Sequence, residues 1–176
     1  MEKKYFRWRS LFLFCLGLFL ASAFCMKWIE SSFIHNGKLF TILGLELTYS
    51  KEQIISILSG IDTPIKSLLR YQLIFDFIFM LGVYPGIAAL NRMAAFKVQS
   101  IRLKKFLLLM AFLQLIAWGC DISENLFLLN WLKKPDAINH LSTYHLIVIV
   151  KWGIALLGII TGLFFIFRKN KNMFKS

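Results

Sequence analysis

The chain has 176 residues, of which 58% are hydrophobic and only 17% are charged, a composition typical of a membrane protein rather than a soluble domain. Its net charge of +12 does not indicate nucleic-acid binding, because the basic residues lie beside the ends of apolar segments, where they would face an anionic lipid surface. We therefore expect one membrane-embedded domain over residues 1–176 and no nucleic-acid partner.

Four apolar runs are each close to the length of about 20 residues that crosses a hydrocarbon core. They cover residues 8–29, 71–90, 106–130 and 143–167. None alternates polar and apolar residues with period two, which favours helices over barrel strands. Because the connections are short, we predict an all-α fold, an antiparallel four-helix bundle embedded in the membrane.

The first run also has features of a cleaved signal peptide, with Ala21, Ser22 and Ala23 as a small-residue cleavage site. However, Trp8 and Trp28 are separated by about 30 Å of helix, a spacing that suits two interfacial anchors. We expect a retained span.

Basic residues precede the first run, separate the second from the third and follow the fourth, while the other two connections are nearly balanced in charge. The positive-inside rule then predicts that both termini are cytoplasmic and that the loop over residues 30–70 is outside.

This outer loop carries two local signals. Asn36 and Gly37 predict the tight turn of a short hairpin, with strands at residues 32–34 and 39–42. Ser50 begins a capping-box spacing and Gly60 is a helix stop, so a short amphipathic helix is expected between them. That helix would either anchor the loop at the membrane surface or act as a lid.

Four ionisable residues inside the apolar runs are the strongest functional signal: Asp76, Asp121, Glu124 and Lys151. A charge at the centre of a membrane helix costs about 2.5 to 3.5 kcal/mol, so such residues generally mark a functional site. Counted at about 1.5 Å per residue, all four fall at one depth on the side of the outer loop.

Further polar residues share faces with these four. Asn125 lies on the face of Asp121 and Glu124, and Gln72 lies one turn from Asp76. Tyr144 aligns with Lys151, and His145 is at the mouth of the last span. The predicted ligand-binding set is therefore Gln72, Asp76, Asp121, Glu124, Asn125, Tyr144, His145 and Lys151.

Several chemical interpretations of this set remain open. Lys151 could simply form a structural ion pair, but three carboxylates against one ammonium leave surplus negative charge, which predicts a bound proton or a cationic ligand. Asp121 and Glu124 are candidate catalytic residues for acid/base chemistry. His140 and His145 lack the i, i+4 spacing of a helical zinc pair, so we expect neither a metal nor a cofactor.

Gly158 and Gly162 form a G-x-x-x-G pair in the last run. Such pairs allow close helix approach, either within the bundle or across a homodimer or larger complex.

Three short motifs carry a resemblance. They are the segment from Ile42 to Glu46, the segment from Asp76 to Pro85, and the Asp-x-x-Glu-Asn motif of Asp121, Glu124 and Asn125 with Lys151-Trp152 after it. Together they resemble uncharacterised four-span proteins of the bacterial inner membrane, which implies that location. The size and layout are also similar to the superfamily of sterol isomerases and the sigma-2 receptor, whose members bind cationic amphiphiles through buried carboxylates; the histidine and glutamate pattern of those isomerases is not matched.

The leading hypothesis is a membrane protein with an outward-facing polar pocket that binds a lipid-like or amphiphilic molecule. One alternative is a membrane-embedded acid/base enzyme that acts on a lipid substrate. The other is a structural subunit of a larger membrane complex. The membrane lipids are the expected partners in each case.

Overall fold

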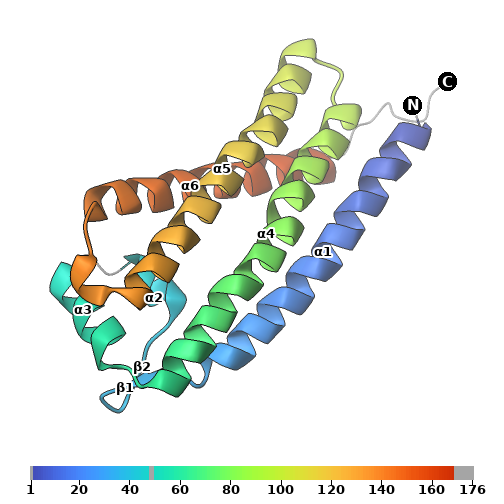
Figure 1. The fold of residues 1–176 in the computed structure, drawn as a ribbon. Coiled ribbons are helices and arrows are strands. Elements are labelled where there is room, and N and C mark those ends of the chain that lie inside the picture. The colour runs from blue at the N-terminus through green and yellow to red at the C-terminus, as the bar shows by residue number, and fades with distance from the viewer. Residues whose placement is uncertain (1, 48–49, 169–176) are drawn as a thin grey trace.

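Four long helices dominate the structure, a computed structural model that describes residues 2–47 and 50–168 (Figure 1). They are α1 (Glu2–Glu30), α4 (Thr63–Lys97), α5 (Ile101–Lys133) and α6 (Leu141–Phe167). The shorter elements are β1 (Ile34–His35), β2 (Lys38–Leu39), α2 (Ile42–Leu47), α3 (Lys51–Gly60) and the 3-10 turn η1 (Pro135–Ala137). Each long helix is long and apolar enough to cross a membrane. The predicted all-α bundle is confirmed, and the chain is an integral membrane protein.

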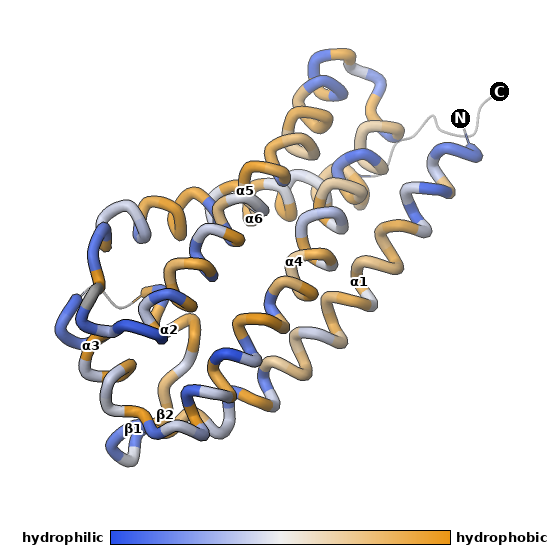
Figure 2. Tube along the Cα trace, viewed as in Figure 1, coloured by the Kyte–Doolittle hydropathy of each residue, from blue (hydrophilic) through white to orange (hydrophobic). Residues whose placement is uncertain are grey.

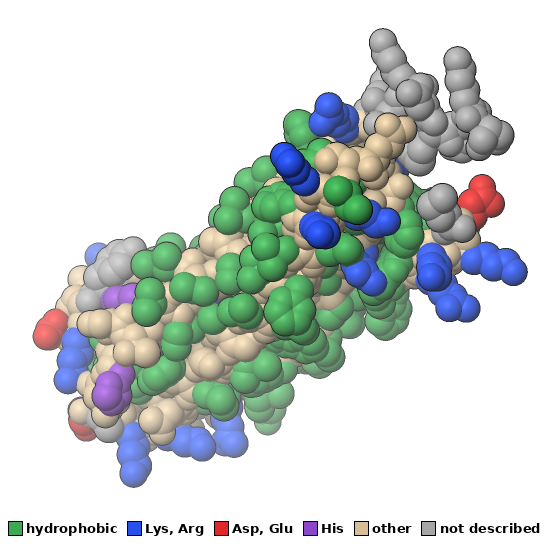
Figure 3. Space-filling model, turned by 90° about the horizontal axis from the view of Figure 1, so that it is seen from above, with side chains coloured by type: hydrophobic (Ala, Val, Ile, Leu, Met, Phe, Trp, Pro, Cys, Tyr) green, Lys and Arg blue, Asp and Glu red, His purple; other side chains and the backbone are tan. Residues whose placement is uncertain are grey.

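The molecule has two chemically different ends (Figures 1 and 3). One end, which we call the hairpin end, holds β1, β2, α2, α3 and η1. The other, the basic end, holds the start of α1, the connection from α4 to α5 and the end of α6. Lys and Arg side chains lie at both ends, but at the basic end Glu2 is the one acidic residue among those described. Hydrophobic residues fill the helices between them (Figure 2). This separation is what a bundle that crosses a membrane requires.

The long helices form a three-helix core with one helix laid against it. α4, α5 and α6 all pack on one another, whereas α1 packs along α4 and makes at most minor contact with the other two in the described part of the chain. Gly82 of α4 permits this close approach, because a Cβ atom at Gly82 would lie 2.6 Å from the backbone nitrogen of Phe19. Most α1 side chains therefore remain exposed to lipid.

The glycine pair of α6 lies inside the bundle. Gly158 and Gly162 are both buried, and added Cβ atoms would lie 2.8 Å from Ile87 and 2.7 Å from Leu90 of α4, respectively. Asn91 of α4 also donates a 2.8 Å hydrogen bond to the carbonyl of Gly158. The pair thus serves helix packing within the chain.

Helix α4 begins about two turns before its apolar run, which shortens the loop that the sequence predicts over residues 30–70. Asp62 caps the helix, because its carboxylate accepts a 3.1 Å hydrogen bond from the backbone N–H of Ile65. Lys66 and Arg70 lie in these first turns and interrupt the apolar pattern, so hydropathy alone places the boundary at Tyr71.

Both local signals of the loop have the predicted type. Asn36 and Gly37 adopt positive φ angles of 50° and 71°, and the turn joins an antiparallel hairpin in which Ile34 pairs with Leu39. The strands are shorter than predicted and lie closer to the turn, because they include His35 and Lys38. The second cannot extend to Ile42, where α2 begins. Ser50 caps α3 by accepting a 3.3 Å hydrogen bond from the backbone of Gln53, and the helix ends at Gly60.

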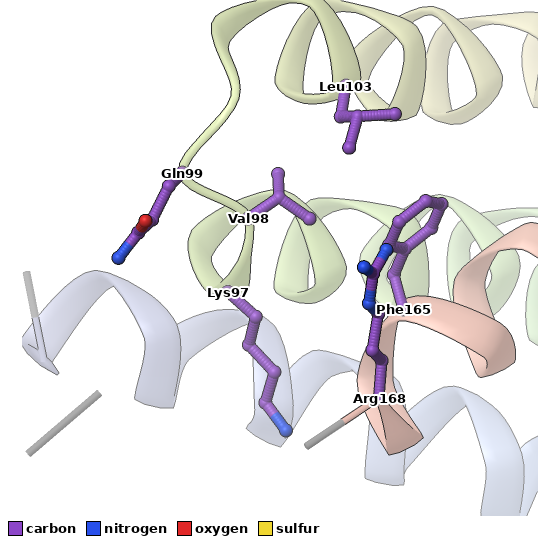
Figure 4. Close-up of a pocket in the computed structure, with 6 residues that line it drawn as sticks. All are labelled: Lys97, Val98, Gln99, Leu103, Phe165 and Arg168. Carbon is purple, nitrogen blue, oxygen red and sulfur yellow. The ribbon is translucent and has the colours of Figure 1, made fainter. Parts of the chain in front are cut away.

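At the basic end, a side-chain hydrogen bond joins the end of α4 to the last turn of α6. The Nζ atom of Lys97 donates a 2.8 Å hydrogen bond to the carbonyl of Ile166. Val98, Leu103 and Phe165 line a small pocket of about 130 Å³ beside this contact, and Arg168 closes one side (Figure 4).

Candidate functional site

A buried ammonium group surrounded by carboxylates occupies the hairpin-end half of the bundle. Lys151 Nζ of α6 lies 2.6 Å from Glu124 Oε2 and 3.1 Å from Asp121 Oδ1, both on α5. It also lies 3.3 Å from Glu46 Oε2 on α2. The Lys151 side chain is only 6% exposed. The carboxylates therefore take the place of water around a buried ammonium group.

The helical spacing of α5 produces half of this arrangement. Asp121, Glu124 and Asn125 stand at i, i+3 and i+4 and are all buried on the face that packs against α4 and α6. The structure therefore brings together Asp121, Glu124 and Lys151, as their depth and faces predict.

Asp76 is linked to the buried carboxylates through the side chain of Asn125. Asn125 Nδ2 donates a 2.6 Å hydrogen bond to Asp76 Oδ2 and a longer one, 3.4 Å, to the carbonyl of Leu73. Asp76 itself is half-buried and forms no ion pair with Lys151. We call Glu46, Asp76, Asp121, Glu124 and Lys151 the acidic cluster.

Glu46 is the member that sequence reasoning missed. Ile42, Leu45 and Glu46 form the buried face of the six-residue helix α2, so the carboxylate points where an apolar side chain would be expected. Trp152 Nε1 donates a 3.2 Å hydrogen bond to the same Glu46 oxygen that faces Lys151. The available signal was a single Glu inside the apolar run from Ile42 to Leu47.

The start of α2 is held by a second buried glutamate. Glu30, at the end of α1, accepts a 3.1 Å hydrogen bond from the backbone N–H of Ile42 and pairs with Lys27 at 2.7 Å. Thr41 Oγ1 accepts another from Gly44 at 2.8 Å. These caps supply acceptors for N–H groups that a helix start leaves unpaired, and they fix α2 over the acidic cluster.

Tyr84 of α4 is a further contact that the sequence did not assign. Its hydroxyl donates a 2.7 Å hydrogen bond to Asp121 Oδ2, the oxygen that does not face Lys151. Both oxygens of Asp121 are thus engaged. Glu124 differs, because neither of its carboxylate oxygens has a hydrogen-bond partner among the described residues, although Oε2 lies at ion-pair distance from Lys151.

The remaining predicted residues lie on the hairpin side of the cluster. Tyr144 is fully buried, with its ring centroid 4.8 Å from that of Trp131, and its hydroxyl has no hydrogen-bond partner in the described chain. Gln72 is buried, and its Oε1 finds no hydrogen-bond partner within residues 2–47 and 50–168. His145 is half-exposed, and its ring centroid is 5.8 Å from that of Tyr144.

The acidic cluster lies apart from four pockets of the described chain. These pockets lie at the helix ends and beside α1, and no member of the cluster lines any of them. Within residues 2–47 and 50–168, no three His, Cys, Asp or Glu side chains are placed to hold a metal ion together. Chemically, the cluster offers surplus carboxylate oxygens for a proton or a cationic group.

Comparison with known protein families, with curated proteins and with solved structures finds no match to this chain.

Proposed function

We propose that this membrane protein binds a cationic amphiphile, a molecule with an amine head and a lipid-like tail, at the acidic cluster. The observation that carries the proposal is the charge balance. Three carboxylates, those of Glu46, Asp121 and Glu124, share one ammonium group, and a fourth, that of Asp76, is linked to them only through the neutral amide of Asn125. Uncompensated charge in a low-dielectric interior is costly, so the cluster favours uptake of an additional cation or protons.

Helix α2 is the natural cover of such a site. It has six residues, and Glu30 holds its first turn through the N–H of Ile42. Its other end is held at the acidic cluster by the contacts of Glu46 with Lys151 and Trp152. An incoming ammonium group that binds Glu46 would compete with Lys151 and Trp152 for that carboxylate and would loosen α2. The cover and the site are therefore coupled through one side chain.

The surroundings favour a lipid-like ligand over a soluble amine. Leu146, Ile149 and Trp152 of α6 are exposed on the outside of the helix, beside the cluster. A molecule that already partitions into the membrane reaches this depth, whereas a hydrated small cation must first be desolvated.

The charge asymmetry supports an orientation for the site. The basic end, which carries the α4–α5 connection, would face the cytoplasm by the positive-inside rule, and the acidic cluster would then face outward. We place the protein in the inner membrane of a bacterium, with both termini cytoplasmic, on the resemblance of its motifs to four-span proteins of that membrane.

Native mass spectrometry with dodecylamine and with dodecanol, two probes of equal chain length, tests the proposal. Dodecylamine should bind the wild-type protein more tightly than dodecanol does. Glu46→Gln removes one charge-assisted contact, worth about 1.5 to 3 kcal/mol, so amine affinity should fall about 10- to 100-fold. Glu52→Gln, a matched change of an exposed acid on α3, should leave it unchanged. Equal affinities for amine and alcohol would contradict the proposal.

A second function, acid/base catalysis, is favoured by one observation: neither carboxylate oxygen of Glu124 has a hydrogen-bond partner in the described chain, and Oε2 lies beside the buried ammonium group. A carboxyl group in that position can exchange a proton with a bound molecule, which is the requirement for an acid/base catalyst. We infer that Glu124→Gln would abolish turnover of a lipid substrate while binding persists. Incubation with membrane lipid extract, followed by mass spectrometry of the products, compares this variant with Glu52→Gln. Equal amounts of product from wild type and from Glu124→Gln would exclude Glu124 as the acid/base catalyst.

A further inference from the structure

A groove with two different parts runs along the molecule between α1 and α5, with α4 as its floor. It exists because α1 packs on α4 and not on α5, which leaves the two outer helices apart. At the basic end, its mouth is a pocket of about 210 Å³, and the next pocket along the groove has about 200 Å³. Trp8 of α1 lines both, so the two parts adjoin.

The mouth of the groove is cationic. Lys4, Arg92 and Lys104 line it, one from each of α1, α4 and α5. Arg92 is half-buried, and its guanidinium lies 4.9 Å from the centre of the Trp8 ring. None of the three forms an ion pair with a carboxylate among the described residues. A phosphate group would supply the negative charge that these three cations lack. The guanidinium of arginine can also donate two parallel hydrogen bonds to phosphate oxygens.

The deeper part of the groove is apolar. Leu11, Pro85, Ala88 and Leu115 line it together with Trp118. From Arg92 to Tyr84 the groove follows α4 for about 12 Å, close to half of a hydrocarbon core of about 30 Å. A head at the membrane interface and a tail that reaches towards the midplane would fit this length within one leaflet.

We propose that this groove binds an anionic phospholipid of the leaflet at the basic end. The phosphate contacts Arg92, Lys4 and Lys104, and one acyl chain passes Trp8 and lies against Leu115 and Trp118. Basic residues at the membrane surface recruit anionic lipids in this way. A free phosphate ion would neutralise the cations at the mouth, but it would not fill the apolar part of the groove. The cationic mouth lies at the opposite end of the bundle from the acidic cluster, and the deeper part of the groove ends at Tyr84, whose hydroxyl donates to Asp121.

The charge half of the site is tested by a matched pair of double variants. In native mass spectrometry, the wild-type protein should bind phosphatidylglycerol in preference to phosphatidylcholine with the same chains. Arg92→Gln with Lys104→Gln should weaken phosphatidylglycerol binding about 30-fold, at about fivefold for each basic residue lost. Arg102→Gln with Lys105→Gln makes the same charge change at the same end, outside both pockets, and should have little effect. If both double variants lost the same phosphatidylglycerol affinity, binding would depend on surface charge in general and not on this groove, which would overturn the proposal.

The apolar half requires a separate arm that leaves every charge in place. Ala88→Phe fills the deeper part and should lower phosphatidylglycerol binding at least tenfold, whereas Leu157→Phe, on an exposed part of α6, should not. Inorganic phosphate, added as a soluble competitor, should displace the lipid poorly. Full displacement by inorganic phosphate, or unchanged lipid binding by Ala88→Phe, would show a phosphate site without an acyl groove. If Ala88→Phe does not fold, the phosphate competition on wild type still decides between the two.

Discussion

Replacement of Lys151 by Met should destabilise the protein strongly, because the variant keeps the volume of the side chain and removes the positive charge of the acidic cluster. Lys151 contacts Asp121, Glu124 and Glu46 at 2.6 to 3.3 Å, and its side chain is 6% exposed. Loss of one partner of a buried ion pair costs about 3 to 5 kcal/mol. Three carboxylates left ionised would cost more, and we expect them to take up protons, so 3 to 5 kcal/mol is the working magnitude.

Thermal unfolding in detergent at pH 7 measures this loss, and double variants locate its source. Lys151→Met combined with Asp121→Asn, Glu124→Gln or Glu46→Gln should recover part of the stability, because each removes a carboxylate that faces Lys151. Combination with Asp76→Asn should recover less, since Asp76 bonds to Asn125 instead. A Lys151→Met protein as stable as wild type would refute the reasoning and would mean that the lysine reaches water.

The other predictions concern topology, packing and the cover. A membrane-impermeant thiol reagent should label Ser59→Cys of α3 and not Ser100→Cys at the basic end in intact cells; the reverse pattern would invert the proposed orientation. Gly82→Ala should destabilise the contact of α1 with α4, because the new Cβ would lie 2.6 Å from Phe19, whereas Gly17→Ala meets nothing within 4 Å and should be neutral or stabilising in the same thermal assay. Glu46→Gln should speed amide exchange in α2 without affecting α5, and unchanged protection of α2 would show that its apolar face alone holds it.

Much of the fold is predictable because the membrane imposes length and polarity on each span. The hairpin turn follows from Asn36 and Gly37, and the start of α3 follows from the cap at Ser50. The position of α1 does not follow from the sequence. Hydropathy makes all four spans alike, and only the close approach at Gly82 shows that α1 rests on α4 alone.

The candidate site is predictable only within the helices. Asp121 and Glu124 share a face by helical periodicity, so their convergence with Lys151 follows from the pattern. Glu46 lies 105 residues from Lys151 in a helix of six residues, too short for a periodicity signal, and its pairing depends on how the loop folds back over the bundle. Tyr84 reaches Asp121 by the packing of α4 on α5, and a tyrosine in an apolar helix gives no signal of such a partner.

Chemical rescue of the Lys151→Met protein tests whether the acidic cluster accepts the cationic head of an amphiphile. Its unfolding temperature should rise on addition of dodecylamine, because the ammonium group of the probe replaces the one that was removed. Dodecanol at the same concentration should give little or no rise. Equal stabilisation by amine and alcohol, or by neither, would contradict the account.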